Sequence, residues 1–198
     1  MRSRYSARTL MTIVTGLCLV GTALAADTYS LDPAHTTVGF SARHFVITKA
    51  RGSFKDYTAT ITYDAKDITK SSMQGTIKVA SIDTGNAKRD EHLRSPDFFD
   101  AAAFPEIKFN STRVEKRGDA YVMVGPLTIR DVTKEVAVPF NITGNVTDPR
   151  GKERVGFDAY LKIKRKDFGV AWDKTLDNGS LIVSDDIDIE IAVEAVKN

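Results

Sequence analysis

The chain has 198 residues, 42% of them hydrophobic, with 28 lysines and arginines against 26 aspartates and glutamates. This length and apolar share are typical of one globular domain with a sizeable core. The near balance of charge gives no indication of nucleic-acid binding, because phosphate backbones select strongly basic surfaces.

Residues 1–25 have the three-part pattern of a secretory signal peptide. Three arginines precede an apolar run over residues 10–23, and Ala23-Leu24-Ala25 matches a small-x-small cleavage site. The pattern predicts a segment that is removed, so no integral membrane span is expected in the mature chain. Removal takes three of the 28 basic residues and no acidic one, which leaves 25 against 26 and a net charge of −1 in residues 26–198. It also removes Cys18, which excludes disulfides and cysteine metal ligands from the mature domain.

The predicted mature domain, residues 26–198, reads as β-structure. Apolar and polar residues alternate over residues 37–45, 75–82 and 186–196. Period-two alternation predicts antiparallel strands with one dry face and one wet face. The predicted inward residues are Val38, Phe40, Ala42 and His44 in the first segment, Ile77 and Val79 in the second, and Ile187, Ile189, Ile191 and Val193 in the third. Many such strands favour a closed barrel or a sandwich, and about eight strands make a barrel that holds one small ligand.

Charge predicts one strand pairing near the C-terminal end. One strand turns lysines outward and a later one turns carboxylates outward, so the two are expected to lie side by side, where opposite charges contribute ~0.2–1 kcal/mol per pair. The residues are Lys162, Lys164 and Lys166 in the first strand, and Asp186, Asp188 and Glu190 in the second.

Residues 84–109 interrupt the strands, and two short helices are expected there. Asn86 is the predicted cap of the first, which runs to Arg94, and Ser95-Pro96-Asp97 predicts the start of a second. A surface helix would let its arginines pair with nearby carboxylates.

A catalytic interpretation of this segment is an alternative. Asp90, Glu91 and His92 are adjacent, and side chains adjacent on a helix diverge by about 100° and do not converge on one substrate. The three histidines, at 35, 44 and 92, have no metal-binding spacing, and no metal site is expected.

The stretch "RDEHLRSPDFFDAAAFPEIKF" resembles the signature of the YceI-like family of bacterial periplasmic lipid-binding proteins. The stretches "YSLDPAHTTVGFSARHF", "GSFKDYTATITYD", "GPLTIRDVTKEV", "DFGVAW" and "LIVSDDIDIEIAVEAV" agree with it in order along nearly the whole mature chain. The chain departs from the family in one hairpin, where Asp131 and Glu135 replace a usual glycine and proline. The resemblance implies a lipocalin-like, extended antiparallel barrel of about eight strands. It also implies an apolar channel for a polyisoprenoid or isoprenoid quinone, with the helical segment as its cover or side wall.

The candidate ligand-contacting residues are large, mostly apolar side chains expected to face inward. They are Val38, Phe40, His44, Phe54, Ile77, Val79, Phe98, Phe99, Phe109, Leu127, Ile129, Phe140, Phe157, Leu161, Ile163 and Trp172. Residue type alone does not separate a cavity wall from a packed core, and Trp172 equally suits a packed loop. His44 is either a core histidine or a head-group contact, and Arg89 and Arg94 are further candidate head-group donors.

The predicted function is binding of a long-chain amphiphilic lipid in the periplasm, for carriage, storage or sensing, without enzymatic activity and with no cofactor beyond the lipid itself. Two alternatives stay open at this point. One is a small hydrolase or isomerase using His44 or His92, and the other is a secreted interaction domain with a solid core. A homodimer is also open.

Overall fold

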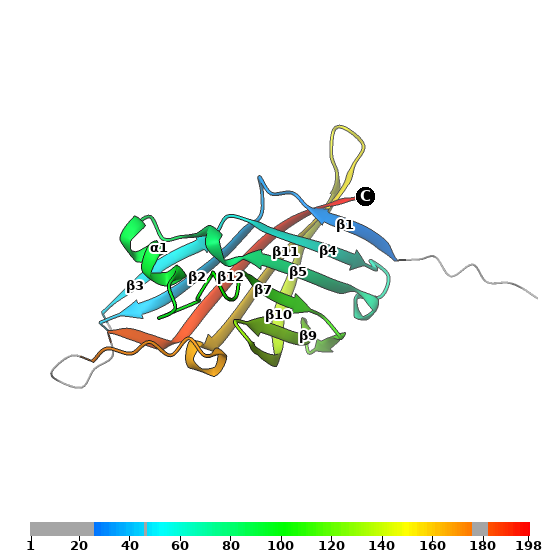
Figure 1. The fold of residues 1–198 in the computed structure, drawn as a ribbon. Helices are drawn as coiled ribbons and strands as arrows, with labels where there is room; N and C mark the ends of the chain where they lie inside the picture. The colour runs from blue at the N-terminus through cyan, green and yellow to red at the C-terminus, as the bar shows by residue number, and fades with distance from the viewer. Residues whose placement is uncertain (1–25, 46, 176–181) are drawn as a thin grey trace, which may run out of the picture.

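The computed structural model describes residues 26–45, 47–175 and 182–198, which form one large β-sheet with a single α-helix (Figure 1). The predicted signal peptide lies outside the described residues. The strands are β1 (Asp27–Leu31), β2 (Thr37–His44), β3 (Thr48–Phe54), β4 (Tyr57–Tyr63), β5 (Ser72–Lys78), β6 (Ile82–Asp83), β7 (Glu106–Asn110), β8 (Arg113–Arg117), β9 (Ala120–Ile129), β10 (Val132–Thr147), β11 (Glu153–Lys164) and β12 (Val183–Lys197). The helical elements are the α-helix α1 (Ala87–Arg94) and the 3-10 turns η1 (Ile68–Lys70), η2 (Val79–Ser81) and η3 (Arg165–Phe168).

Eight antiparallel strands close into a barrel. Their order is β1-β4-β5-β7-β9-β10-β11-β12, and β12 returns to β1 through the pairs Tyr29–Lys197 and Leu31–Ala195. Closure leaves these eight strands without a free edge, which stabilises long strands against pairing with other chains. The predicted lipocalin-like barrel of about eight strands is confirmed.

The barrel is extended at one end by a second set of strands. β12 is 15 residues long. Its C-terminal part pairs with β1, while its N-terminal part pairs with β2, from Val183 opposite His44 to Ala192 opposite Thr37. β3 then pairs with β2, and the short β6 pairs with the end of β3. One long strand therefore joins two successive partners and lengthens the enclosed space.

The alternating segments face as their pattern predicts. On β12, Ile187, Ile189, Ile191 and Val193 all border the interior of the barrel. On β2, the residues Val38, Phe40 and Ala42 do the same. The alternation ends earlier than expected at Val79, because β5 stops at Lys78 and Val79 begins the turn η2.

The predicted charge pairing of β11 with β12 is confirmed. Lys162 lies opposite Asp188 and Lys164 opposite Asp186, and Lys162 Nζ is 3.4 Å from Asp188 Oδ1. Lys166 lies beyond the strand in η3, and its Nζ donates to Asp173 Oδ2 at 2.7 Å.

The helix α1 begins where predicted, and the second predicted helix is wrong. Asn86 caps α1 by accepting a hydrogen bond from Arg89 N at 3.1 Å. Ser95 does not cap a following helix, because its hydroxyl donates to His92 O at 2.7 Å and so completes the C-terminal end of α1. Residues 96–99 form turns, and Asp100 has φ 50, which interrupts a right-handed helical path. None of the helices in the described part of the chain is long and apolar enough to cross a membrane.

Candidate functional site

An apolar cavity occupies the interior of the barrel. Its volume is about 290 Å³, roughly twenty times the space that one water molecule needs. The wall draws residues from both clusters of buried side chains, one around Val38, Phe54 and Ile107 and the other around Ile61 and Phe140. The cavity therefore runs along the barrel from one core cluster to the other.

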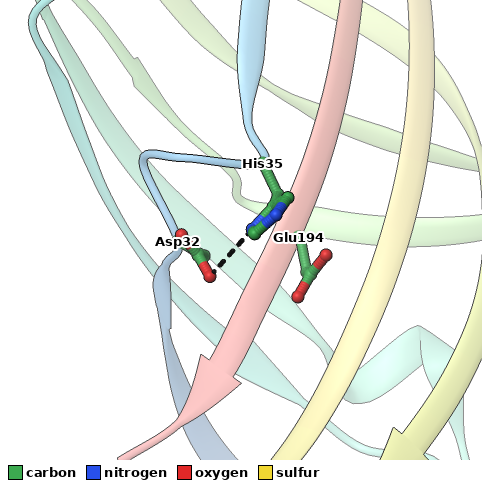
Figure 2. Close-up of side chains that lie close together, drawn as sticks. All are labelled: Asp32, His35 and Glu194. Carbon is green, nitrogen blue, oxygen red and sulfur yellow. Dashed lines mark hydrogen bonds and ion pairs between the residues drawn. The ribbon is translucent and has the colours of Figure 1, made fainter.

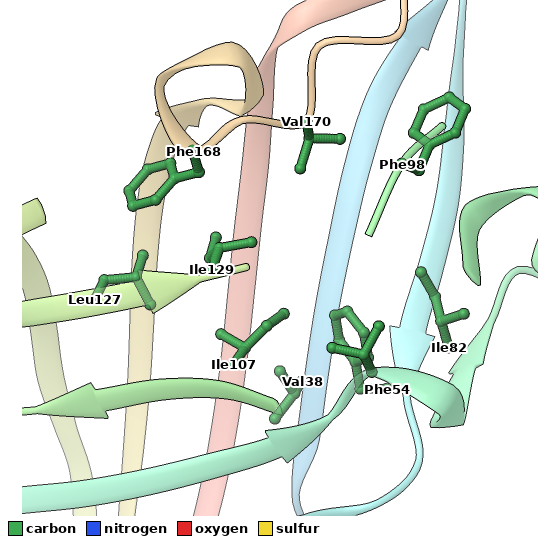
Figure 3. Packing of buried hydrophobic residues seen from close by; sticks show 10 residues of the cluster. Val38, Phe54, Ile82, Phe98, Ile107, Leu127, Ile129, Phe168 and Val170 are labelled. Atoms are coloured by element: carbon green, nitrogen blue, oxygen red, sulfur yellow. The ribbon is translucent and has the colours of Figure 1, made fainter. Parts of the chain in front are cut away.

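The first of these clusters is formed by side chains from several strands and two connecting segments. Figure 3 shows Phe54, Ile107 and Leu127 on the strands, with Phe98 from the segment after α1 and Phe168 from η3. Leu93, Phe98 and Phe99 all lie on the cavity wall. The segment from α1 to Phe99 is thus a side wall of the cavity, where the barrel strands alone leave the interior uncovered.

Most of the candidate residues lie on this wall. They are Val38, Phe40, Phe54, Ile77, Phe98, Phe99, Phe109, Leu127, Ile129, Phe140, Phe157, Leu161 and Ile163. A glycine opposite Phe40 makes room for its ring, because a Cβ on Gly52 would lie 2.5 Å from Phe40 Cζ. Whether these side chains contact a ligand stays a prediction.

Three candidate residues lie elsewhere. Val79 is 1% exposed and packs in the core without reaching the wall. His44 is the last residue of β2, and its ring lies against that of Phe45 in a tilted arrangement, with centroids 3.9 Å apart. The ring centroid of Trp172 lies 5.2 Å from that of Phe98 and 5.4 Å from that of His92. Trp172 therefore belongs to an aromatic cluster next to the wall residue Phe98.

The predicted head-group arginines are used to hold α1 in place. Arg89 Nη2 donates to Thr84 O at 2.9 Å and Arg94 Nη1 donates to Ile82 O at 3.3 Å. The expected pairing of these arginines with neighbouring carboxylates is therefore wrong. Asp90 is 8% exposed, and its Oδ1 accepts hydrogen bonds from the backbone and hydroxyl of Thr84. Backbone carbonyls at a strand end are otherwise unsatisfied, so these contacts fix the side wall against the barrel.

One charged residue on the wall was missed by sequence reasoning. Arg165 is 5% exposed and borders the cavity. Its Nη1 donates to Val170 O at 2.9 Å and Trp172 O at 2.6 Å, and its Nε donates to Ser184 O at 3.1 Å. The signal was present in the alternation, since Lys162, Lys164 and Lys166 face outward and place position 165 inward. Its Nη2 also lies 3.3 Å from Asp185 Oδ1. These contacts join η3 to the start of β12.

Neither histidine of the catalytic alternative lies on the cavity wall. His92 Nε2 lies 3.0 Å from Asp97 Oδ2 on the exposed side of α1. Within residues 26–45, 47–175 and 182–198, the hydrogen-bond partner of the His92 ring is this carboxylate and not a serine or threonine hydroxyl.

A separate polar cluster lies where the β1–β2 connection meets β12, and Figure 2 shows Asp32, His35 and Glu194 close together there. Glu194 lies far from Asp32 and His35 in the sequence, so sequence reasoning did not identify this cluster. Arg154 on β11 lies among them, with Nη1 2.7 Å from Asp32 Oδ2 and 2.6 Å from Glu194 Oε1. The hydrogen bonds from Arg154 and His35 lower the pKa of Asp32 to about 2. The guanidinium supplies the positive charge that a metal ion would otherwise supply, so the cluster is an ion-pair network.

Comparison with known proteins agrees with the fold. The family model of the YceI-like domain matches residues 29–195. A UPF0312 protein of Serratia proteamaculans (strain 568) is 40% identical over 194 residues, which cover 96% of this chain and 97% of that protein. The crystal structure of the Campylobacter jejuni YCEI protein is similar with a TM-score of 0.69 and 39% identity, over 86% of this chain and 98% of that chain.

A third structure shows the same fold at low identity. It is a polyisoprenoid binding domain from Saccharophagus degradans, with a TM-score of 0.67 and 16% identity over 87% of this chain and 99% of that domain.

Proposed function

The chain belongs to the YceI-like family, and from this premise and the apolar cavity we propose that it binds a long-chain amphiphilic lipid, a polyisoprenoid or isoprenoid quinone, inside the barrel. The predicted signal peptide supports a periplasmic location, where such a protein carries or stores the lipid. A domain of this fold from another organism is described as polyisoprenoid-binding.

The observation that carries the proposal is the continuity of the apolar wall. Its described residues come from strands around the barrel and from the side wall, and they are almost all carbon at the surface of the cavity. A chain that buried roughly 500 Å² of apolar surface there would gain ~12 kcal/mol before the cost of ordering it. Such a wall selects hydrocarbon, because the wall offers a bound chain few hydrogen-bonding partners.

The proposal predicts that filling the cavity removes lipid binding without unfolding the barrel. Gly75 on β5 faces the cavity, and a Cβ there would meet Ala59 Cβ at 3.7 Å, an ordinary contact. Gly75→Leu should occupy part of the channel with apolar atoms and keep thermal stability at or above the wild-type level. Mass spectrometry of organic extracts should show at least a several-fold loss of bound lipid.

Gly144→Leu is the matched control. Gly144 lies on β10, is exposed, and has no atom within 4 Å of a built Cβ, so this variant should keep its lipid. Absence of any lipid from the wild-type protein, with no uptake of added polyprenyl compounds or quinones, would refute the proposed function.

A further inference from the structure

The β2–β3 hairpin carries exposed apolar side chains at the end of the cavity. Ile47 is 80% exposed and Phe45 is 39% exposed. Ala42 and Val183 lie on the cavity wall, and Val183 is the strand partner of His44, the residue before Phe45. The cavity thus extends to within a few residues of the hairpin tip.

Backbone hydrogen bonds hold the described residues Phe45 and Ile47 near this tip. Phe45 has φ 52, in a region that a bulky residue rarely adopts. Its backbone N–H donates to Ile182 O at 2.9 Å, and Ile47 N donates to His44 O at 3.1 Å. The ring of Phe45 contacts the ring of His44 at a tilt, with centroids 3.9 Å apart. A bulky residue kept in a costly conformation, with its side chain partly in solvent, indicates a surface made for contact.

The outward face of the same hairpin is basic. Arg43 and Lys49 lie opposite each other, and Arg51 lies opposite Ser41 on the same face. The sequence holds no aspartate or glutamate between positions 33 and 55. Lys49 pairs with Asp188 at 2.8 Å. In the described part of the chain, Arg43 and Arg51 form no ion pair. On the same face, β12 places Asp188 opposite Ser41 and Glu190 opposite Gly39. The hairpin therefore combines an apolar tip with three cations, of which Lys49 is the one in an ion pair among the described residues.

We propose that this hairpin docks on a bilayer surface that carries anionic headgroups, and that the bound lipid passes between bilayer and cavity at this end. The inference rests on the proposed function. Apolar side chains that enter the headgroup boundary, with cations facing anionic lipid, are the two features that hold a protein on a membrane surface. A symmetric contact between two copies would bring like-charged hairpins together, which argues against a dimer at this surface.

The test is co-sedimentation of the purified mature protein with phosphatidylcholine vesicles, with and without phosphatidylglycerol. We expect binding that requires phosphatidylglycerol and weakens as salt increases. Ile47→Ser should weaken it about tenfold, and Arg43→Gln or Arg51→Gln about five-fold each. The matched controls are Val146→Ser, at a residue that is 63% exposed, and Arg150→Gln on the β10–β11 hairpin. Both controls should bind as the wild type does.

Lipid extracted from the same preparations separates this inference from the proposed function. A wild type that contains lipid and does not sediment with vesicles would overturn the docking site and leave lipid binding intact. A wild type that sediments and neither contains nor takes up lipid would overturn the proposed function instead. If Ile47→Ser lowers the molecular mass in sedimentation equilibrium and leaves vesicle binding unchanged, the tip is a contact between copies and the proposal is wrong.

Discussion

Arg130 occupies a conformation that usually belongs to glycine, in the tight turn between β9 and β10. It has φ 56, and it lies in the two-residue turn between the paired residues Ile129 and Val132. The next residue, Asp131, is not in the left-handed region. Arg130 Nη1 donates to Phe98 O at 2.9 Å and to Gly169 O at 3.0 Å. The turn thus joins the side wall of the cavity to the segment after η3.

Arg130→Gly should destabilise the protein, although glycine suits the backbone better. Relief of the left-handed conformation gains about 1 kcal/mol. The loss of two hydrogen bonds from a charged donor costs about 1.5–3 kcal/mol each, so we expect a net loss of about 2 kcal/mol or more in urea unfolding. Asp131→Ala is the control, since Asp131 is exposed, and it should change stability little. A more stable Arg130→Gly variant would contradict this account.

The strands were predictable from the sequence because alternation reports directly on burial. β2 and β12 were expected within a few residues of their observed bounds, and their predicted inward residues border the cavity except His44 at the end of β2. The second helix failed because Ser95 has two possible uses, as an N-terminal cap or at the end of the preceding helix. Only the positive φ of Asp100, a tertiary feature, decides between them.

The candidate site was predictable to the extent that it depends on strand parity. Ile77 reaches the wall, whereas Val79, of the same parity, does not, because the strand ends between them. The hydrogen-bond partners of Arg89 and Arg94 are backbone carbonyls of the segment just before α1, which residue types do not reveal. Whether an inward residue borders space or other atoms depends on the closure of the whole barrel.

At the scale of elements, the Arg154 network ties together the β1–β2 connection, the β10–β11 hairpin and β12. Arg154 Nε also donates to Asp148 Oδ2 at 2.9 Å. The folded-state pKa of Asp32 is about 2, below the value of about 3.9 expected in the unfolded chain. The unfolded state therefore binds this proton first, and the contribution of Asp32 to stability is complete above about pH 4 and is lost as pH falls toward 2.

Arg154→Met should remove this pH dependence. The free energy of unfolding of the variant, measured with urea, should lie below that of the wild type at neutral pH, and the difference should shrink between about pH 4 and pH 2. Arg150→Met on the same hairpin should follow the wild-type curve at every pH. A constant difference between wild type and Arg154→Met across this range would show that Asp32 gains nothing from the guanidinium.

At the scale of the molecule, a closed eight-stranded barrel leaves a space along its axis that side chains fill only in part. Side chains of both core clusters line the cavity, and other members of each cluster pack away from it. The protein therefore contains inward residues of two kinds, which differ in whether water can reach them once the cavity is empty. Ile77 and Val79 are an example of each, two positions apart.

Ile77→Glu and Val79→Glu distinguish a cavity from a solid core. At Val79, which is 1% exposed and off the wall, an unpaired carboxylate costs several kcal/mol, a large part of a typical stability of about 5–15 kcal/mol. We expect Val79→Glu to unfold or lose most of its thermal stability. At Ile77 the carboxylate faces the cavity and keeps water, so Ile77→Glu should fold and lose bound lipid at least tenfold. Equal destabilisation by the two variants would indicate a packed interior, and a folded Ile77→Glu with its full lipid content would place the ligand elsewhere.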